Sequence, residues 1–137
     1  MTYNLQILIL LVVITQVIYA GDTGDIVLGD TKALHQKVRY IWVVSADQVA
    51  KSPVWKKDDT LALSPQKAEA IAYAWSRRQR LAGFIPERPF VISLVQFPEP
   101  FGDRYFYKVH FATPDGRDSF WSVHILMDGT IVEPMRK

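Results

Sequence analysis

Two turn signals between three apolar runs are the feature that most constrains how this chain can fold. The runs, which are rich in aromatic and β-branched residues, cover 104–111, 119–127 and 131–132. Such runs are typical of strands. Residues 114–116 read Pro-Asp-Gly and residues 128–129 read Asp-Gly. Both suit tight hairpin turns, because proline presets the turn and glycine accepts a left-handed backbone. The pattern therefore predicts an antiparallel meander of consecutive strands.

The turns also predict which residues face one another. A three-residue Pro-Asp-Gly loop places Val109 opposite Trp121, and a two-residue Asp-Gly loop places Ile125 opposite Val132. In this register one face of the meander is continuously apolar. Because side chains alternate between the two faces of a strand, the register and the hydrophobic pattern support each other.

A helix is expected before the meander. Ser64 can accept hydrogen bonds from the free N–H groups of a first helical turn, Pro65 needs no N–H there, and Gly83 suits the end of the helix. An apolar stripe recurs at helical spacing at Ala68, Ile71, Ala72 and Trp75. With further strands expected at 38–44 and 90–97, the chain is predicted to be an α+β protein, with one main helix packed on an antiparallel meander sheet of about four strands.

The N-terminal residues predict export. Residues 7–14 are uninterrupted apolar, and Ala20 is a small residue after which a secretory signal peptide can be cleaved. We expect residues 1–20 to be a signal peptide, 21–37 a tether, with one short edge strand as the alternative, and 38–137 a single α+β domain in the periplasm or outside the cell. The alternative is an uncleaved N-terminal membrane anchor, although the apolar stretch is short for a span of about 20 residues.

Composition limits the chemistry that this chain can perform. Removing 20 of the 137 residues would leave 117, enough for one domain with its own core. The 16 Lys and Arg against 14 Asp and Glu give a net charge of +2, whereas a nucleic-acid surface needs a one-signed patch. The chain has no cysteine, which excludes disulfides, thiolate metal sites and a cysteine nucleophile. We expect no cofactor, no nucleic-acid partner and, after signal cleavage, no membrane contact.

The histidines are too dispersed to predict a metal site. In the expected register, His110 and His124 share the outward face of the meander but lie about 14 Å apart, and His35 lies in the tether. The chain also lacks the G-x-S-x-G elbow of serine hydrolases. We therefore expect a protein that is not an enzyme.

The alternative is a small hydrolase of the cell envelope. Glu87, Glu99 and Asp103 bracket one loop region, and a pair of carboxyl groups with different pKa values can perform acid–base hydrolysis. However, Glu99 sits between two prolines and Asp103 suits the cap of a turn. Nothing in the sequence supplies the apolar pocket that raises a carboxyl pKa.

The outward face of the meander is the candidate interaction surface. It is lined by Phe106, Lys108, His110, Phe120, His124 and Leu126. Large apolar groups gathered on one face mark an interaction site unless another part of the chain covers them. Two interpretations stay open: residues 21–52 fold back over this face, or it binds a protein partner or a second copy of the chain. Phe101, on the proline-rich loop 97–101, is a further candidate contact, with ordinary loop packing as the alternative.

Three motifs resemble a known family. Residues 64–72 fit S-x-x-K-A-x-x-I-A, residues 107–109 read Tyr-Lys-Val, and residues 127–132 read Met-Asp-Gly-Thr-Ile-Val. Together they resemble a PepSY-like or cystatin-like unit of small exported bacterial proteins of unknown role, over residues 60–134. The resemblance implies a helix on an antiparallel sheet and a non-catalytic binding module of the cell envelope that can modulate peptidases. The Q-x-V-x-G inhibitory loop of cystatins has no match in this chain.

Overall fold

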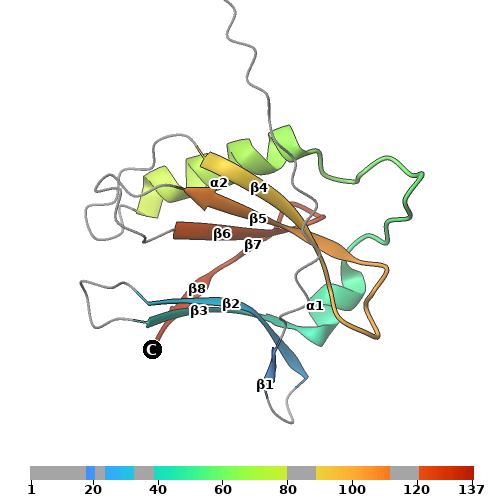
Figure 1. Cartoon of the computed structure of the whole chain (residues 1–137), viewed down its shortest axis with the longest axis horizontal. Coiled ribbons are helices and arrows are strands. Elements are labelled where there is room, and N and C mark those ends of the chain that lie inside the picture. The colour runs from blue at the N-terminus through green and yellow to red at the C-terminus, as the bar shows by residue number, and fades with distance from the viewer. Residues whose placement is uncertain (1–17, 21–23, 33–38, 80–88, 112–120) are drawn as a thin grey trace, which may run out of the picture.

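The computed structural model describes residues 18–20, 24–32, 39–79, 89–111 and 121–137. In chain order the elements are β1 (Ile18–Ala20), β2 (Asp25–Lys32), β3 (Arg39–Ser45), α1 (Ala46–Lys51), α2 (Pro65–Gln79), β4 (Pro89–Gln96), β5 (Tyr105–Phe111), β6 (Trp121–Leu126), β7 (Ile131–Val132) and β8 (Pro134–Arg136) (Figure 1).

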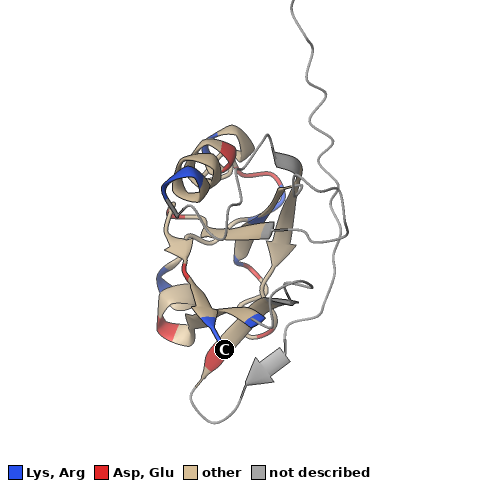
Figure 2. Cartoon of the chain, turned by 90° about the vertical axis from the view of Figure 1, so that its left-hand side faces the viewer, with Lys and Arg blue, Asp and Glu red and all other residues tan. Residues whose placement is uncertain are grey.

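The described chain forms three layers. Helix α2 covers one face of an antiparallel sheet with the order β4-β5-β6-β7, which we call the helix-backed sheet. A second antiparallel sheet, β1-β2-β3-β8, lies against the opposite face, and we call it the covering sheet. Figure 2 shows the same stacking after a quarter turn. The predicted α+β class with antiparallel strands is confirmed, whereas the covering sheet was not predicted.

Helix α2 begins at the signal that the sequence predicts. The backbone N–H of Lys67 donates to Ser64 Oγ at 3.2 Å, and Pro65 is the first helical residue. The helix is described as far as Gln79, so the predicted end at Gly83 lies outside the described residues.

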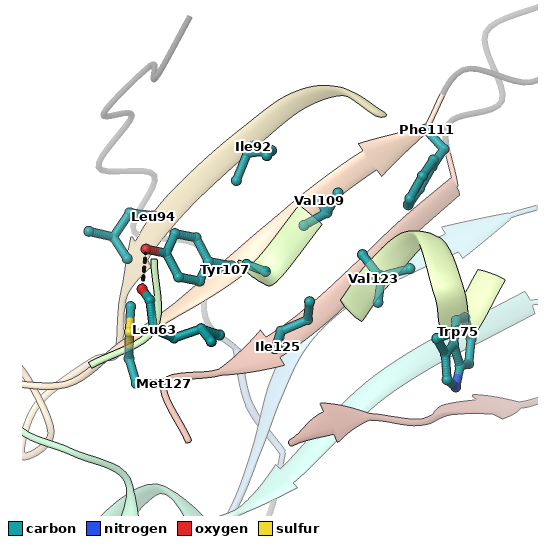
Figure 3. Packing of buried hydrophobic residues seen from close by; sticks show 12 residues of the cluster. Leu63, Trp75, Ile92, Leu94, Tyr107, Val109, Phe111, Val123, Ile125 and Met127 are labelled. Carbon is teal, nitrogen blue, oxygen red and sulfur yellow. Dashed lines mark hydrogen bonds between the residues drawn. The ribbon is translucent and has the colours of Figure 1, made fainter. Parts of the chain in front are cut away.

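The core between α2 and the sheet, the helix-side cluster, depends on small residues in the helix. Its buried members are Leu63, Ala68, Ala72, Trp75, Ile92, Leu94, Tyr107, Val109, Phe111, Val123, Ile125 and Met127 (Figure 3). Ala68 and Ala72 have no exposed surface, because the helix approaches the strands closely there. Tyr107 Oη donates to the carbonyl of Leu63 at 2.8 Å, which ties β5 to the segment before α2. Burial raises the pKa of Tyr107 to about 12, so this hydroxyl keeps its proton.

The β5–β6 register differs from the prediction by two residues. Val109 faces Val123 and Phe111 faces Trp121, instead of Val109 facing Trp121. The tip predicted at 114–116 lies outside the described residues, and the connection between β5 and β6 spans 112–120. Because the side-chain period of a strand is two, the shift leaves every side chain on its predicted face.

The β6–β7 register differs by one residue, and that exchanges two faces. Leu126 N–H donates to the carbonyl of Thr130 at 2.9 Å, which closes a three-residue loop instead of the predicted two-residue turn. Gly129 holds the left-handed position with a φ of 88°. Ile125 therefore faces Ile131, not Val132. As a result Ile131 packs on the helix side and Val132 lies between the sheets.

The chain then crosses from one sheet to the other. After Glu133, strand β8 pairs with β3, and Pro134 lies opposite Trp42. The Trp75 indole Nε1 donates to Glu133 Oε1 at 3.1 Å, so α2 holds the crossing point. The helix-backed sheet thus ends at β7, and β8 adds an edge to the covering sheet.

The predicted tether is wrong for residues 25–32, which form β2. This strand pairs with β3 along its length, and Ile26 and Leu28 are buried. An irregularity in pairing between Val27 and Gly29 marks a β-bulge, and it explains why the apolar alternation stops there. Strand β1, which pairs with β2, consists of the last three residues of the predicted leader. Cleavage after Ala20, which stays a prediction, would remove β1 and leave β2 as the edge strand.

We predict that enlarging a buried alanine of α2 destabilises the protein. Ala72→Leu should lower the free energy of unfolding by about 1–3 kcal/mol, because the added methyl groups have no space against the sheet. Ala74→Leu is the matched control, since Ala74 is exposed on the same helix, and its effect should stay within about 0.5 kcal/mol. Urea unfolding measures both, and equal losses in the two variants would contradict this packing.

Candidate functional site

The face that the sequence offers as an interaction surface lies between the two sheets. Phe106 and Leu126 are each 1% exposed and His124 is 0% exposed. Lys108 and His110 are half-buried, and Phe120 lies outside the described residues. The prediction of an open docking face is therefore wrong at the three buried positions. The alternative, in which residues before 52 fold back over this face, is confirmed for the described strands and α1.

An apolar core closes the two sheets on each other. This inter-sheet cluster consists of Ile26, Leu28, Trp42, Val44, Val49, Phe97, Phe106, Leu126 and Val132. Burial of Val, Leu, Ile or Phe side chains stabilises a fold by about 1.5–3 kcal/mol each. Five of its residues come from β2, β3 and α1, and they cover the face of the helix-backed sheet that α2 does not reach. The apolar side chains that were predicted to face outward, Phe106 and Leu126, are thus buried against other parts of the same chain.

The two histidines are closer than the sequence predicts. His124 faces Lys108, and His110 faces Ser122. The imidazoles are therefore diagonal neighbours on adjacent strands, a relation that separates positions by about 7–8 Å, not about 14 Å. The difference follows from the two-residue shift of register. The structure brings Lys108, His110, Ser122 and His124 into one polar group on the inter-sheet face, which we call the histidine cluster.

His124 occupies an apolar site. Its ring centroid lies 4.9 Å from that of Trp42 and 5.9 Å from that of Phe106. Neither ring nitrogen has a hydrogen-bond partner. A Cβ built on Gly29 would lie 3.4 Å from Nε2, so the strand with the bulge passes directly over the imidazole. Burial, then the charge of Lys108 and of His110, holds the pKa of His124 well below 6.5.

His110 has a polar partner. Its Nδ1 lies 3.1 Å from Ser122 Oγ on the neighbouring strand. Burial, and after it the charge of Lys108, lowers the pKa of His110 to about 4. Both imidazoles are therefore neutral at pH 7.

A serine beside a histidine raises the question of nucleophilic catalysis, which needs a base that is matched to the working pH. A pKa of about 4 makes His110 a weak general base at neutral pH. Ser122, the second residue of β6, is 4% exposed, so a substrate carbonyl cannot reach it in this conformation. The described residues also contain no group of three or more His, Cys, Asp or Glu placed to hold a metal ion. The Ser122–His110 contact is therefore better explained as a cross-strand side-chain pair than as a nucleophile with its general base.

The carboxylates of the alternative hydrolase site do not form a buried pair. Asp103 is bonded to Arg104 Nη1 at 2.8 Å, and its side chain is 52% exposed. Glu99 is exposed, and its Oε1 lies against Gly102. Glu87 lies outside the described residues. Glu99 and Asp103 are both exposed, so neither lies in the apolar pocket that acid catalysis by a carboxyl group needs.

The loop that carries Phe101 is fixed to α1. Phe101 is half-buried and packs against the inter-sheet cluster, with the Arg104 guanidinium carbon 5.9 Å from its ring centroid. Arg104 Nε donates to the carbonyl of Ser52 at 3.2 Å, and Nη2 donates to that of Ala50 at 3.1 Å. Cations favour helix C-termini, where the last carbonyls lack partners within the helix. Arg104 thus joins the start of β5 to the end of α1.

The remaining candidate is the edge of the helix-backed sheet. Strand β4 has eight residues and pairs only with β5 within the described sheet. Between Arg88 and Glu99 the chain has no charged residue. Ile92 and Leu94 belong to the helix-side cluster, and Val95 packs against the inter-sheet cluster. The sequence predicts this strand as apolar on both faces; its edge position follows from its being the first strand of the meander.

The comparisons with known proteins found no relatives. No family model matches the chain, and no curated protein and no solved structure shows significant similarity to it. In the part of the chain that the structure describes, no helix combines the length and the apolar character that crossing a membrane requires.

We predict that Arg104 is worth more to stability than an exposed arginine. Arg104→Ala should lower the free energy of unfolding by about 1.5–3 kcal/mol, because it leaves two carbonyls at the end of α1 without their charged donor. Arg136→Ala, at an exposed position of β8, is the control and should change stability by less than about 0.5 kcal/mol. Thermal and urea unfolding measure the difference, and indistinguishable variants would contradict the assigned contacts.

Proposed function

We propose that this chain is an exported, non-catalytic binding module of the cell envelope that docks an extended protein segment along β4. The observation that carries the proposal is an uncharged eight-residue edge strand that pairs on one side only. The export half of the proposal rests on the apolar leader, residues 1–20.

Physical chemistry favours β4 as the docking edge. An edge strand presents a row of backbone N–H and C=O groups, and natural proteins commonly protect long edges with charges, prolines or bulges. An incoming extended segment gains main-chain hydrogen bonds there, while side-chain pockets on alternate positions give selectivity. Because α2 and the covering sheet pack on both faces of the helix-backed sheet, β4 is ordered before a partner arrives, which reduces the entropic cost of binding.

The resemblance to PepSY-like and cystatin-like units supports the same class of function. It adds peptidases of the cell envelope, or their substrates, as the partners that such a segment would come from. A second copy of the chain, paired β4 to β4, is the self-association version of the same proposal. Both versions need no cofactor, no nucleic acid and, after signal cleavage, no membrane.

A phage-displayed library of random peptides tests the proposal directly. Peptides selected on the wild-type chain should lose binding at least tenfold on Val91→Lys, because lysine on an edge strand opposes strand addition. Val91 is half-buried and lies opposite His110, so an unchanged contact between the His124 and Trp42 rings must show that the variant keeps its fold. Met135→Lys is the matched control: Met135 is 49% exposed on β8 of the covering sheet, and binding should be unchanged. Amide chemical shifts of bound protein should move along 89–96.

Sedimentation equilibrium tests the self-association version on the same variants. A dimer of the wild-type chain that Val91→Lys converts to a monomer supports pairing of β4 with itself. A monomer at all concentrations, together with no peptide selected against the wild-type chain, would overturn the proposed function.

A further inference from the structure

We propose that the contact between the two sheets is an acid-released latch: below neutral pH the covering sheet leaves the helix-backed sheet and uncovers the apolar face around Phe106 and Leu126. The proposal rests on His124, which has no exposed surface and no hydrogen-bond partner on either ring nitrogen. It does not depend on docking at β4.

The two cores of the molecule can separate because they share no residue. The helix-side cluster lies between α2 and one face of the helix-backed sheet, so it is complete without β2 and β3. The inter-sheet cluster takes Ile26, Leu28, Trp42 and Val44 from the covering sheet, so it exists only while the sheets are in contact. A change confined to the inter-sheet space can therefore release one layer and leave the other packed.

Among the described side chains that face that space, none is a carboxylate that could pair with a protonated imidazole. From β5, His124 meets Lys108 directly opposite and His110 on the diagonal. From β3 it meets the Trp42 ring, and Tyr40 is the titratable residue on the same face of that strand.

The remaining neighbours of His124 carry no compensating charge. On β2, Gly29 lies against the imidazole, while alternation places Asp25 on the opposite face from the buried Ile26. The β4 and β7 residues that face this space are Val91, Ser93, Val95 and Val132. A proton on His124 would thus bring an unpaired charge into an apolar site beside Lys108, which is strongly unfavourable.

The direction of the pH effect follows from linkage. Both imidazoles have a lower pKa between the sheets than in an open chain, where a histidine titrates near 6.5. Opening therefore takes up protons below about pH 6.5, and the closed state weakens as the pH falls from there toward the His110 pKa of about 4. Each proton taken up raises the ratio of open to closed protein about tenfold per pH unit, so two histidines give up to about 100-fold.

Two anchors define how the layers part. The hydrogen bond from Trp75 holds Glu133 on α2, so the chain leaves β7 from a fixed point on its way to β8. Arg104 fixes the end of α1, which follows β3, to the start of β5. Neither Glu133 nor Arg104 belongs to the inter-sheet cluster, so both anchors can stay in place while that cluster opens.

Hydrogen exchange on the wild-type protein, expressed as protection factors between pH 7.5 and pH 4, tests the latch. Amides of β2 and β3 should lose protection at a higher pH than those of β5 and β6, and 8-anilinonaphthalene-1-sulfonate should fluoresce in the same range as it binds the uncovered face. Simultaneous loss in both sheets, or β2 and β3 amides that stay protected to pH 4, would overturn the proposal.

Two variants test whether His124 is one of the groups that take up a proton when the sheets part. His124→Leu fills the apolar site without a titratable group, so the steepness of release should fall from up to about 100-fold to about tenfold per pH unit, with the midpoint at lower pH. Ile125→Val, on the opposite face of β6, is the control: it weakens the fold but should leave the steepness unchanged. An unaltered acid transition in His124→Leu would also overturn the proposal, and the wild-type exchange profile decides it if that variant does not fold.

Discussion

The packing of the covering sheet on Phe106 and Leu126 removes from water the face of β5 and β6 that α2 cannot reach. A sheet with one helix has one covered face, and here the other face carries aromatic and aliphatic side chains that would otherwise be a large exposed apolar patch. The hairpin of β2 and β3 supplies the cover, and β8 ties that cover to the last strand of the helix-backed sheet. The burial of His124 and the position of α1, whose Val49 belongs to the inter-sheet cluster, both follow from this arrangement.

The sequence was sufficient for the parts of the fold that local signals determine. Ser64 and Pro65 start α2, and Ser45 starts α1 with the capping-box contact to Gln48. The shift of two residues between β5 and β6 did not matter to the faces, because it equals one full period of a strand. A single residue at the Asp-Gly turn mattered more: the three-residue loop that ends at Gly129 sends Ile131 and Val132 to the faces opposite those predicted.

The covering sheet lay beyond what local patterns can predict. In β2 the alternation holds at Ile26 and Leu28, but the bulge before Gly29 breaks it, and the segment looks polar as a whole. Strand β8 follows Pro134, a residue that marks the end of a central strand but is tolerated at an edge. The same limit applies to the candidate site. Local patterns do not show that Trp42, from a strand far away in the sequence, packs on His124, or that neither ring nitrogen of His124 has a hydrogen-bond partner.

Functionally, these features separate two kinds of surface. The apolar face that the sequence offers as a docking site is buried inside the molecule, and the two imidazoles on it are neutral and too weakly basic for general-base catalysis at pH 7. Within the described sheet, β4 pairs on one side only, and the proposed function uses the main chain of that edge. A binding module of this design would recognise an extended segment by strand addition and would keep its larger apolar surface buried between the two sheets.

The most direct test of this account is the nuclear Overhauser spectrum of the histidine ring protons at pH 7. With ring centroids 4.9 Å apart, His124 and Trp42 should give cross-peaks between their ring protons, and the His124 shifts should show no titration centred near pH 6.5. An imidazole that shows no contact with Trp42 and titrates near pH 6.5, as in an unfolded chain, would mean that the second sheet does not cover the first.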